Sequence, residues 1–131
     1  MKRRRKTKKA SSGRTGLVID LHRYTALQAR EKIRKTVENA QRHDVIICIH
    51  GYGASGKGGG LRSAVREYIY NELFCKDRAI GGCVHCEDLL NPREMDNPYY
   101  KLHIDQYHKA LETRPNLKEY AGNPGVTLLM L

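Results

Sequence analysis

Two short apolar runs, separated by a segment of helical length, constrain the fold of this 131-residue chain more than any other feature. One run covers residues 17–22 and the other residues 45–50. Between them, apolar residues recur every three or four positions, the period of an amphipathic helix, and Thr25 with Gln28 fits a capping box at its start. We expect this helix to end near Arg42. The pattern predicts a right-handed strand–helix–strand unit, with the carboxyl ends of two parallel strands at one edge of a sheet.

The rest of the chain continues the alternation of strands and helices. Apolar residues at helical spacing predict a second helix from about Leu61, followed by a strand over about 79–86 and a last strand over 125–131. Residues 88–122 are polar and contain three of the four prolines, so we expect an insertion with one weak helical stretch near 105–113. The order of elements predicts an α/β domain with a mixed sheet.

Basic residues are concentrated at the N-terminus. The chain has 24 Lys and Arg against 14 Asp and Glu, and residues 1–16 hold eight of the basic residues and no acidic one. Residues 17–131 therefore carry 16 basic and 14 acidic residues, a net charge of only +2. We expect a basic flexible tail over 1–16 and one domain over 17–131. The tail is a candidate phosphate-binding arm; a solubilising tail and a nuclear-import signal are the alternatives.

Targeting signals and metal motifs are weak. No apolar run is long enough to cross a membrane, and no hydrophobic segment follows the basic N-terminus, so we expect a cytoplasmic protein.

Cys83 and Cys86 have the spacing of zinc ligands, but no second such pair is present to complete a site. We therefore expect reduced structural thiols, with neither a metal nor another cofactor.

Asp20 and His22 lie two positions apart at the end of the first predicted strand, so their side chains project to the same face. An Asp beside a His orients the imidazole and supports its protonated form, as a general base or acid requires. The alternative is an ordinary strand end at which polar residues meet solvent.

Six glycines occur among residues 51–60, between the second predicted strand and the next helix. Backbone N–H groups at such a position favour an anion, although glycine also serves turn geometry alone. The segment matches most of a nucleotide-binding P-loop, but Gly58 stands where Ser or Thr would hold magnesium, which argues against nucleotide hydrolysis.

Three side chains in or after this segment are candidate nucleic-acid ligands. Tyr52 offers a surface on which a base can stack. Arg62 and Arg66 follow one helical turn apart and are either phosphate ligands or ordinary solvated cations.

The sequences Ile19-Asp20-Leu21-His22 and His50-Gly51-Tyr52-Gly53 together resemble the two signatures of the Smr (small MutS-related) family. The longer stretch over residues 49–66 and the ending over 122–128 resemble short stand-alone bacterial members. This resemblance implies a two-layer βαβαββ sandwich, similar to the C-terminal domain of a translation initiation factor. It also implies nucleic-acid binding and, as in several members, nuclease activity on DNA or on messenger RNA at stalled ribosomes. The sequence departs from the family at Arg23, where many members have Gly, and in the longer segment 88–122.

These residues predict metal-independent cleavage of RNA, with nucleic acid as the partner. The resemblance to the Smr family implies the ribosome as a further candidate partner. The expected catalytic residues are Asp20, His22 and His50. The expected phosphate-binding residues are Gly51, Tyr52, Gly53, Lys57, Arg62 and Arg66. Two alternatives remain open: a DNA-nicking endonuclease in which Asp20 and His22 hold a divalent ion, and a non-catalytic RNA- or ribosome-binding module.

Overall fold

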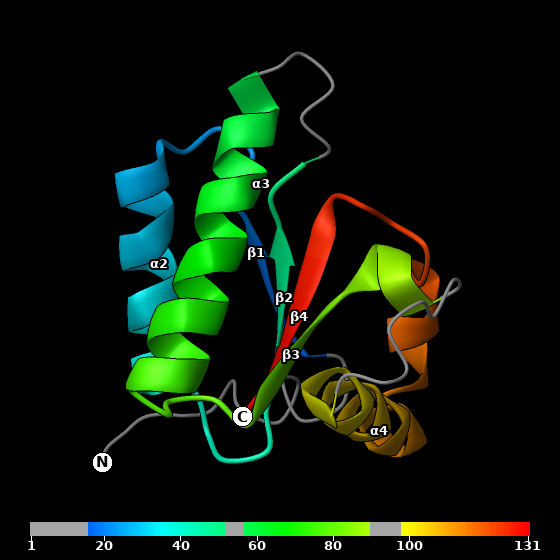
Figure 1. Cartoon of the computed structure of the whole chain (residues 1–131). Coiled ribbons are helices and arrows are strands. Elements are labelled where there is room, and N and C mark those ends of the chain that lie inside the picture. The colour runs from blue at the N-terminus through cyan, green and yellow to red at the C-terminus, as the bar shows by residue number, and fades with distance from the viewer. Residues whose placement is uncertain (1–15, 52–56, 90–97) are drawn as a thin grey trace.

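The computed structural model describes residues 16–51, 57–89 and 98–131. These residues form a mixed α/β structure with a four-stranded sheet, as predicted (Figure 1). In chain order, the elements are β1 (Leu17–Asp20), α2 (Ala26–Asn39), β2 (Val45–Ile49), α3 (Lys57–Glu67), the π-helix η1 (Tyr68–Lys76), β3 (Gly82–His85), the 3₁₀-helix η2 (Cys86–Leu89), α4 (Pro98–Thr113), the 3₁₀-helix η3 (Pro115–Tyr120) and β4 (Val126–Met130).

The strands lie in the order β1-β2-β4-β3. β1 pairs with β2 in parallel, as the sequence predicted, whereas β4 pairs antiparallel with both β2 and β3. The carboxyl ends of β1, β2 and β3 therefore meet the amino end of β4 at one edge of the sheet. We call this edge, marked by Asp20, Ile49, His85 and Val126, the carboxyl edge.

α2 begins where the sequence predicted. The Thr25 hydroxyl accepts the backbone N–H of Gln28, and the Gln28 side chain accepts the backbone N–H of Thr25, so the capping box is confirmed. Ala29 and Ile33 are buried on the face that packs against the sheet. The helix ends at Asn39, three residues before the predicted end, and a turn with His43 in the left-handed region leads into β2.

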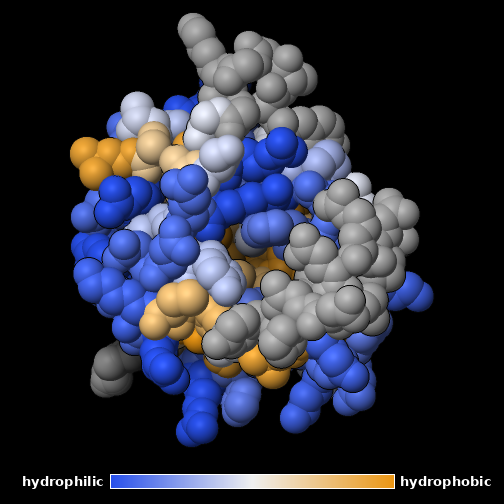
Figure 2. Space-filling view, viewed as in Figure 1, coloured by the Kyte–Doolittle hydropathy of each residue, from blue (hydrophilic) through white to orange (hydrophobic). Residues whose placement is uncertain are grey.

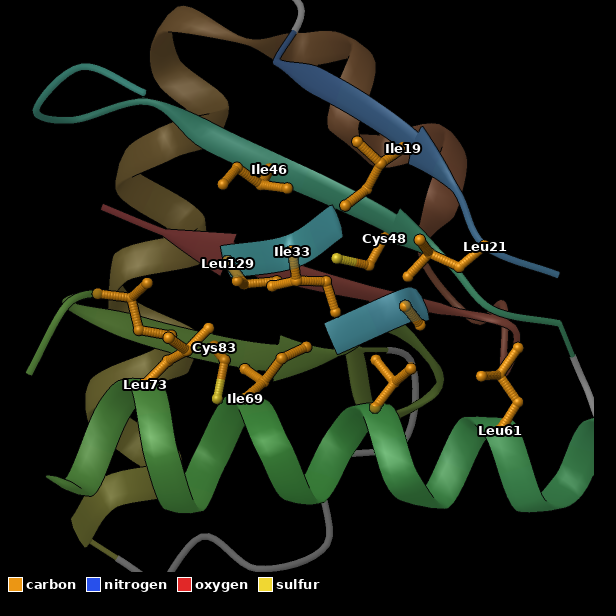
Figure 3. Packing of buried hydrophobic residues seen from close by; sticks show 13 residues of the cluster. Ile19, Leu21, Ile33, Ile46, Cys48, Leu61, Ile69, Leu73, Cys83 and Leu129 are labelled. Atoms are coloured by element: carbon orange, nitrogen blue, oxygen red, sulfur yellow. The ribbon is translucent and has the colours of Figure 1, made fainter. Parts of the chain in front are cut away.

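α2 and α3 cover the same face of the sheet (Figure 1). The core between these helices and the sheet contains side chains from every strand, including those that Figure 3 labels: Ile19, Leu21, Ile33, Ile46, Cys48, Leu61, Ile69, Leu73, Cys83 and Leu129. α3 starts at Lys57, four residues before the predicted position. It continues into the π-helix η1, a wider helical form that the apolar spacing did not reveal.

α4 packs against the opposite face of the sheet and differs most from the prediction. It has 16 residues, lies between β3 and β4, and extends the expected βαβαββ order by one helix (Figure 1). With η3 it encloses a second core of apolar side chains: Val45, Ile47, Val84, Cys86, Tyr107, Leu117, Val126, Leu128 and Met130. The sheet is thus covered on both faces, in three layers instead of the expected two.

Hydrophilic side chains predominate on the face of the molecule over α2 and α3 (Figure 2). This agrees with the amphipathic pattern of α2, whose buried residues all lie on the side that faces the sheet. Of the helices described, none combines the length and the apolar character needed to span a membrane.

Candidate functional site

Asp20 and His22 form a hydrogen-bonded pair at the carboxyl edge. Oδ1 of Asp20 lies 2.5 Å from Nδ1 of His22 and also accepts the backbone N–H of His22 at 3.2 Å. The two side chains are 55% and 52% exposed, respectively. Leu21, between them, is fully buried in the core beneath α2, so strand alternation turns both polar groups to the other face of β1. The proximity predicted from their spacing is therefore present.

The direction of the hydrogen bond between His22 and Asp20 suits a general base. The hydrogen bonds from the side chain and backbone of His22 lower the pKa of the Asp20 carboxyl, so Asp20 is a carboxylate at neutral pH. A carboxylate only accepts, and it therefore holds the proton of neutral His22 on Nδ1. This leaves the lone pair on Nε2, and in the described part of the chain no group bonds to that nitrogen.

Gly51 lies directly beside His22. A Cβ atom added to Gly51 would stand 3.8 Å from the Cβ of His22, and Gly51 has φ +88°, in the region that favours glycine. Both of its backbone polar groups are engaged: its N–H donates to the carbonyl of Gly125 at 3.1 Å, and its carbonyl accepts from Nδ1 of His50. The Gly51 amide, which we had expected to bind phosphate, is therefore used within the fold.

His50 is buried, with only 1% of its surface exposed. Its Nδ1–H donates to the Gly51 carbonyl at 3.0 Å, and its Nε2 lies 2.9 Å from the hydroxyl of Thr127. Burial, together with the nearby positive charge of Arg66, lowers the pKa of His50 to about 4. His50 is therefore neutral at neutral pH and has no free nitrogen, a placement that differs from the expectation that it acts on the reacting groups.

Arg66 points inward from α3 to the strand ends. Its Nε–H donates to the Thr127 hydroxyl at 3.2 Å, and Nη2 donates to Glu87 at 2.6 Å and to the carbonyl of Pro124 at 3.2 Å. The Arg66 and Glu87 side chains are only 15% and 32% exposed. Arg66 is thus occupied by internal contacts, whereas our sequence analysis placed it against phosphate.

The remaining predicted residues lie around the same edge or outside the described residues. Arg62, one turn before Arg66 on α3, is half-buried and donates to the carbonyl of Pro124 at 3.5 Å, a weak contact. Lys57 is the first residue of α3. Tyr52 and Gly53 lie outside the described residues.

Three residues that the sequence analysis did not single out complete this edge: Thr127, His85 and Glu87. Thr127 is fully buried on β4, and His85 is its partner in the β3–β4 register. Burial, with a further contribution from Arg66, lowers the pKa of His85 to about 4. Thr127 is the one polar residue in the apolar strand sequence VTLLM, and this was the only local sign that its side chain has a specific role.

Cys83 and Cys86 are separated by the sheet. Cys83 belongs to the core beneath α2 and α3, and Cys86 belongs to the core beneath α4. Burial raises the pKa of each thiol to about 12, which keeps both protonated at neutral pH. The two sulfurs thus cannot bind one metal ion together, and the described residues contain no other cluster of metal-ligating side chains.

The family model of the Smr domain matches residues 19–79. This match supports an Smr-domain protein, and it suggests nucleic-acid binding or nuclease activity in general. The matched segment runs from β1 through η1, so it contains Asp20, His22, His50 and Arg66, while β3, α4 and β4 lie outside it. No match is found among curated proteins or among solved structures.

Proposed function

We propose that this protein is an endoribonuclease that cleaves single-stranded RNA without a metal ion. The observation that carries the proposal is the exposed Asp20–His22 pair, in which the carboxylate holds Nδ1 of the imidazole and leaves the lone pair on Nε2 to act as a base. The segment that contains the pair matches the Smr domain, and its position at the carboxyl edge is where ligands bind in sheets with parallel strands.

In the proposed reaction, Nε2 of His22 accepts the proton of a ribose 2′-hydroxyl. The 2′-oxygen then forms a bond to the adjacent phosphorus, and the bond from phosphorus to the 5′-oxygen breaks. The leaving oxygen takes up a proton from Lys57 or from solvent, since His50 is buried and neutral. The products are a 2′,3′-cyclic phosphate and a 5′-hydroxyl, and no step requires a metal ion.

Binding of the phosphate backbone is assigned to the amino end of α3, to Arg62 and to the basic N-terminal segment. The amino end of α3, with Lys57 as its first residue, presents N–H groups and a favourable dipole to an anion. Arg62 lies in the next turn of α3 and is only weakly engaged by Pro124. The basic segment 1–16 adds eight positive charges that increase affinity for any polyanion.

The test compares the wild-type protein with His22→Ala on end-labelled single-stranded RNA in the presence of EDTA. We expect the wild type to cleave and to leave cyclic-phosphate ends, and the variant to lose about 10²-fold or more of the rate. His108→Ala serves as the matched control, because His108 is an exposed histidine on α4 and should be dispensable.

Other outcomes would replace the proposal. A 3′-hydroxyl product, or cleavage abolished by EDTA, would exclude the 2′-hydroxyl route and favour a metal-dependent nuclease, and preferential nicking of DNA would identify the DNA-directed alternative. Tight RNA binding by both proteins with no cleavage by either would identify a binding module.

A further inference from the structure

We propose that Thr127 is a positioning residue: it links Arg66 to His50 and thereby holds Gly51 in place against His22. We call this series of contacts the Thr127 relay, comprising Arg66, Thr127, His50 and Gly51. The inference rests on the proposed function for its effect on catalysis, but the relay itself can be tested without any activity.

Each proton of the relay has only one consistent position. The carbonyl of Gly51 can only accept, so Nδ1 of His50 carries the proton that it donates there. In the neutral ring, Nε2 is then an acceptor. Arg66 has only donors, so its Nε–H occupies a lone pair of the Thr127 hydroxyl. The hydroxyl proton of Thr127 is thereby directed to Nε2 of His50.

The contact between Thr127 and His50 is shielded from solvent, so water cannot easily substitute for this hydrogen bond. Thr127 is fully buried and His50 is 1% exposed, so removing the hydroxyl leaves Nε2 without a donor in a dry environment. Arg66 is itself fixed by Glu87 and by the carbonyl of Pro124. The relay therefore starts from a side chain that cannot easily move, and it ends at the backbone of Gly51.

Gly51 is the point at which the relay can affect the reacting groups. Its carbonyl is held by His50, its N–H is held by Gly125 on the approach to β4, and an added Cβ atom would contact the Cβ of His22. Rotation of the Gly51 peptide would change the space beside the imidazole and the start of the glycine-rich segment. Displacements of about 1 Å at such positions reduce rates by up to about 10²-fold.

The experiment compares Thr127→Val with Thr127→Ser. Valine keeps the shape and the strand preference of threonine but lacks the hydroxyl, whereas serine restores it. The first readout is the ring ¹⁵N chemical shifts of His50, which report whether Nε2 accepts a hydrogen bond as well as which nitrogen carries the proton. The second is the rate of RNA cleavage, with kcat separated from KM. Thr36→Val is the matched control, since the Thr36 hydroxyl donates to the backbone carbonyl of Lys32 within α2, away from the relay.

We expect Thr127→Val to shift the Nε2 resonance of His50, because this nitrogen loses its hydrogen-bond donor, and to lose about 10- to 100-fold in kcat. KM should stay within about threefold, which marks a loss confined to the transition state. Thr127→Ser should recover both readouts, and Thr36→Val should change neither. An unchanged Nε2 resonance in Thr127→Val would refute the relay, and a shifted resonance with normal kcat would refute its positioning role. A wild-type protein that cleaves no RNA would refute the proposed function and the positioning role of Thr127 with it, while the Nε2 resonance would still decide whether the relay exists.

Discussion

Gly51 approaches His22 so closely that a Cβ atom at position 51 would contact the Cβ of His22 at 3.8 Å. This distance is an ordinary van der Waals contact, so space alone would allow an alanine. The backbone would not, because Gly51 has φ +88°, where a side chain is strained.

Gly51→Ala should therefore reduce both stability and activity. We expect the free energy of unfolding to fall by about 1–2 kcal/mol, since the strain must be borne or the peptide must rotate. Rotation would also break the hydrogen bond from His50 and disturb His22, which would lower the cleavage rate. Urea unfolding and an RNA-cleavage assay measure the two effects.

Gly60→Ala is the control for this substitution. Gly60 is an exposed residue of α3, and nothing lies within 4 Å of an added Cβ. Alanine should be neutral or stabilise this helix by up to about 1 kcal/mol. Equal stability of the two variants would contradict the importance assigned to the left-handed backbone at Gly51.

Asp20→Asn tests the orienting carboxylate. Asparagine keeps the size of the side chain but loses the charge that fixes the imidazole, so the cleavage rate should fall by about 10²-fold or more. Stability should change little, because more than half of the Asp20 side chain is exposed. Glu31→Gln removes an equally exposed carboxylate from α2 and should leave cleavage intact. Full activity in Asp20→Asn would mean that the Asp20–His22 contact has no catalytic role.

The first half of the fold was accessible from local sequence patterns, whereas α4 was not. The start of α2 follows from a capping box and its buried face from apolar residues at helical spacing, both of which are local. In α4, two of the side chains that contact the core are His103 and Tyr107, which do not give a clear apolar stripe. The full length of α4 becomes favourable only against the sheet, which no local window contains.

The candidate site likewise has a part that local sequence patterns predict and a part that they do not. Alternation along one strand was sufficient to place Asp20 and His22 on one face. The neighbours of His50 depend instead on β4, which enters the sheet between β2 and β3 and brings Thr127 beside His50 from 77 residues away. Such non-local pairing has no short-range signature. The sequence analysis therefore assigned His50 and Arg66 to the substrate and did not reveal that both contact Thr127.

The buried imidazoles of His50 and His85 should make stability dependent on pH. Burial lowers the pKa of each to about 4, whereas an unfolded histidine titrates near 6.5. Below about pH 6.5 the unfolded chain binds protons that the folded chain does not, so stability is complete above this pH and declines toward pH 4. Each imidazole should contribute about 2 kcal/mol to the loss between about pH 7 and about pH 5.

Urea unfolding at several pH values measures this dependence. His85→Asn should reduce the slope of stability against pH, because one buried imidazole is removed. His108→Asn removes an exposed imidazole from α4 and should leave the slope unchanged. Stability that stays constant from pH 7 to pH 5 would show that both imidazoles are protonated as easily in the folded protein as in the unfolded chain.

Removal of residues 1–14 tests the basic segment. These residues contain eight Lys and Arg, which on binding would release counterions from RNA. The logarithm of the binding constant should depend less steeply on the logarithm of salt concentration, by about 0.7 for each phosphate that is no longer neutralised. Filter binding at a series of salt concentrations gives this slope. An unchanged slope would remove the segment from RNA binding and leave the phosphate contacts to the residues near α3.

The ion pair between Arg66 and Glu87 should matter far more than the surface pair between Arg34 and Glu31. Glu87→Gln leaves Arg66 mostly buried without a carboxylate, and we expect a loss of about 1–3 kcal/mol in unfolding free energy. It should also slow RNA cleavage, because Arg66 anchors the hydroxyl of Thr127. Glu31→Gln breaks an exposed pair of similar length and should have no measurable effect on stability. Equal effects of the two substitutions would show that the contacts of Arg66 at the carboxyl edge contribute no more than an exposed ion pair.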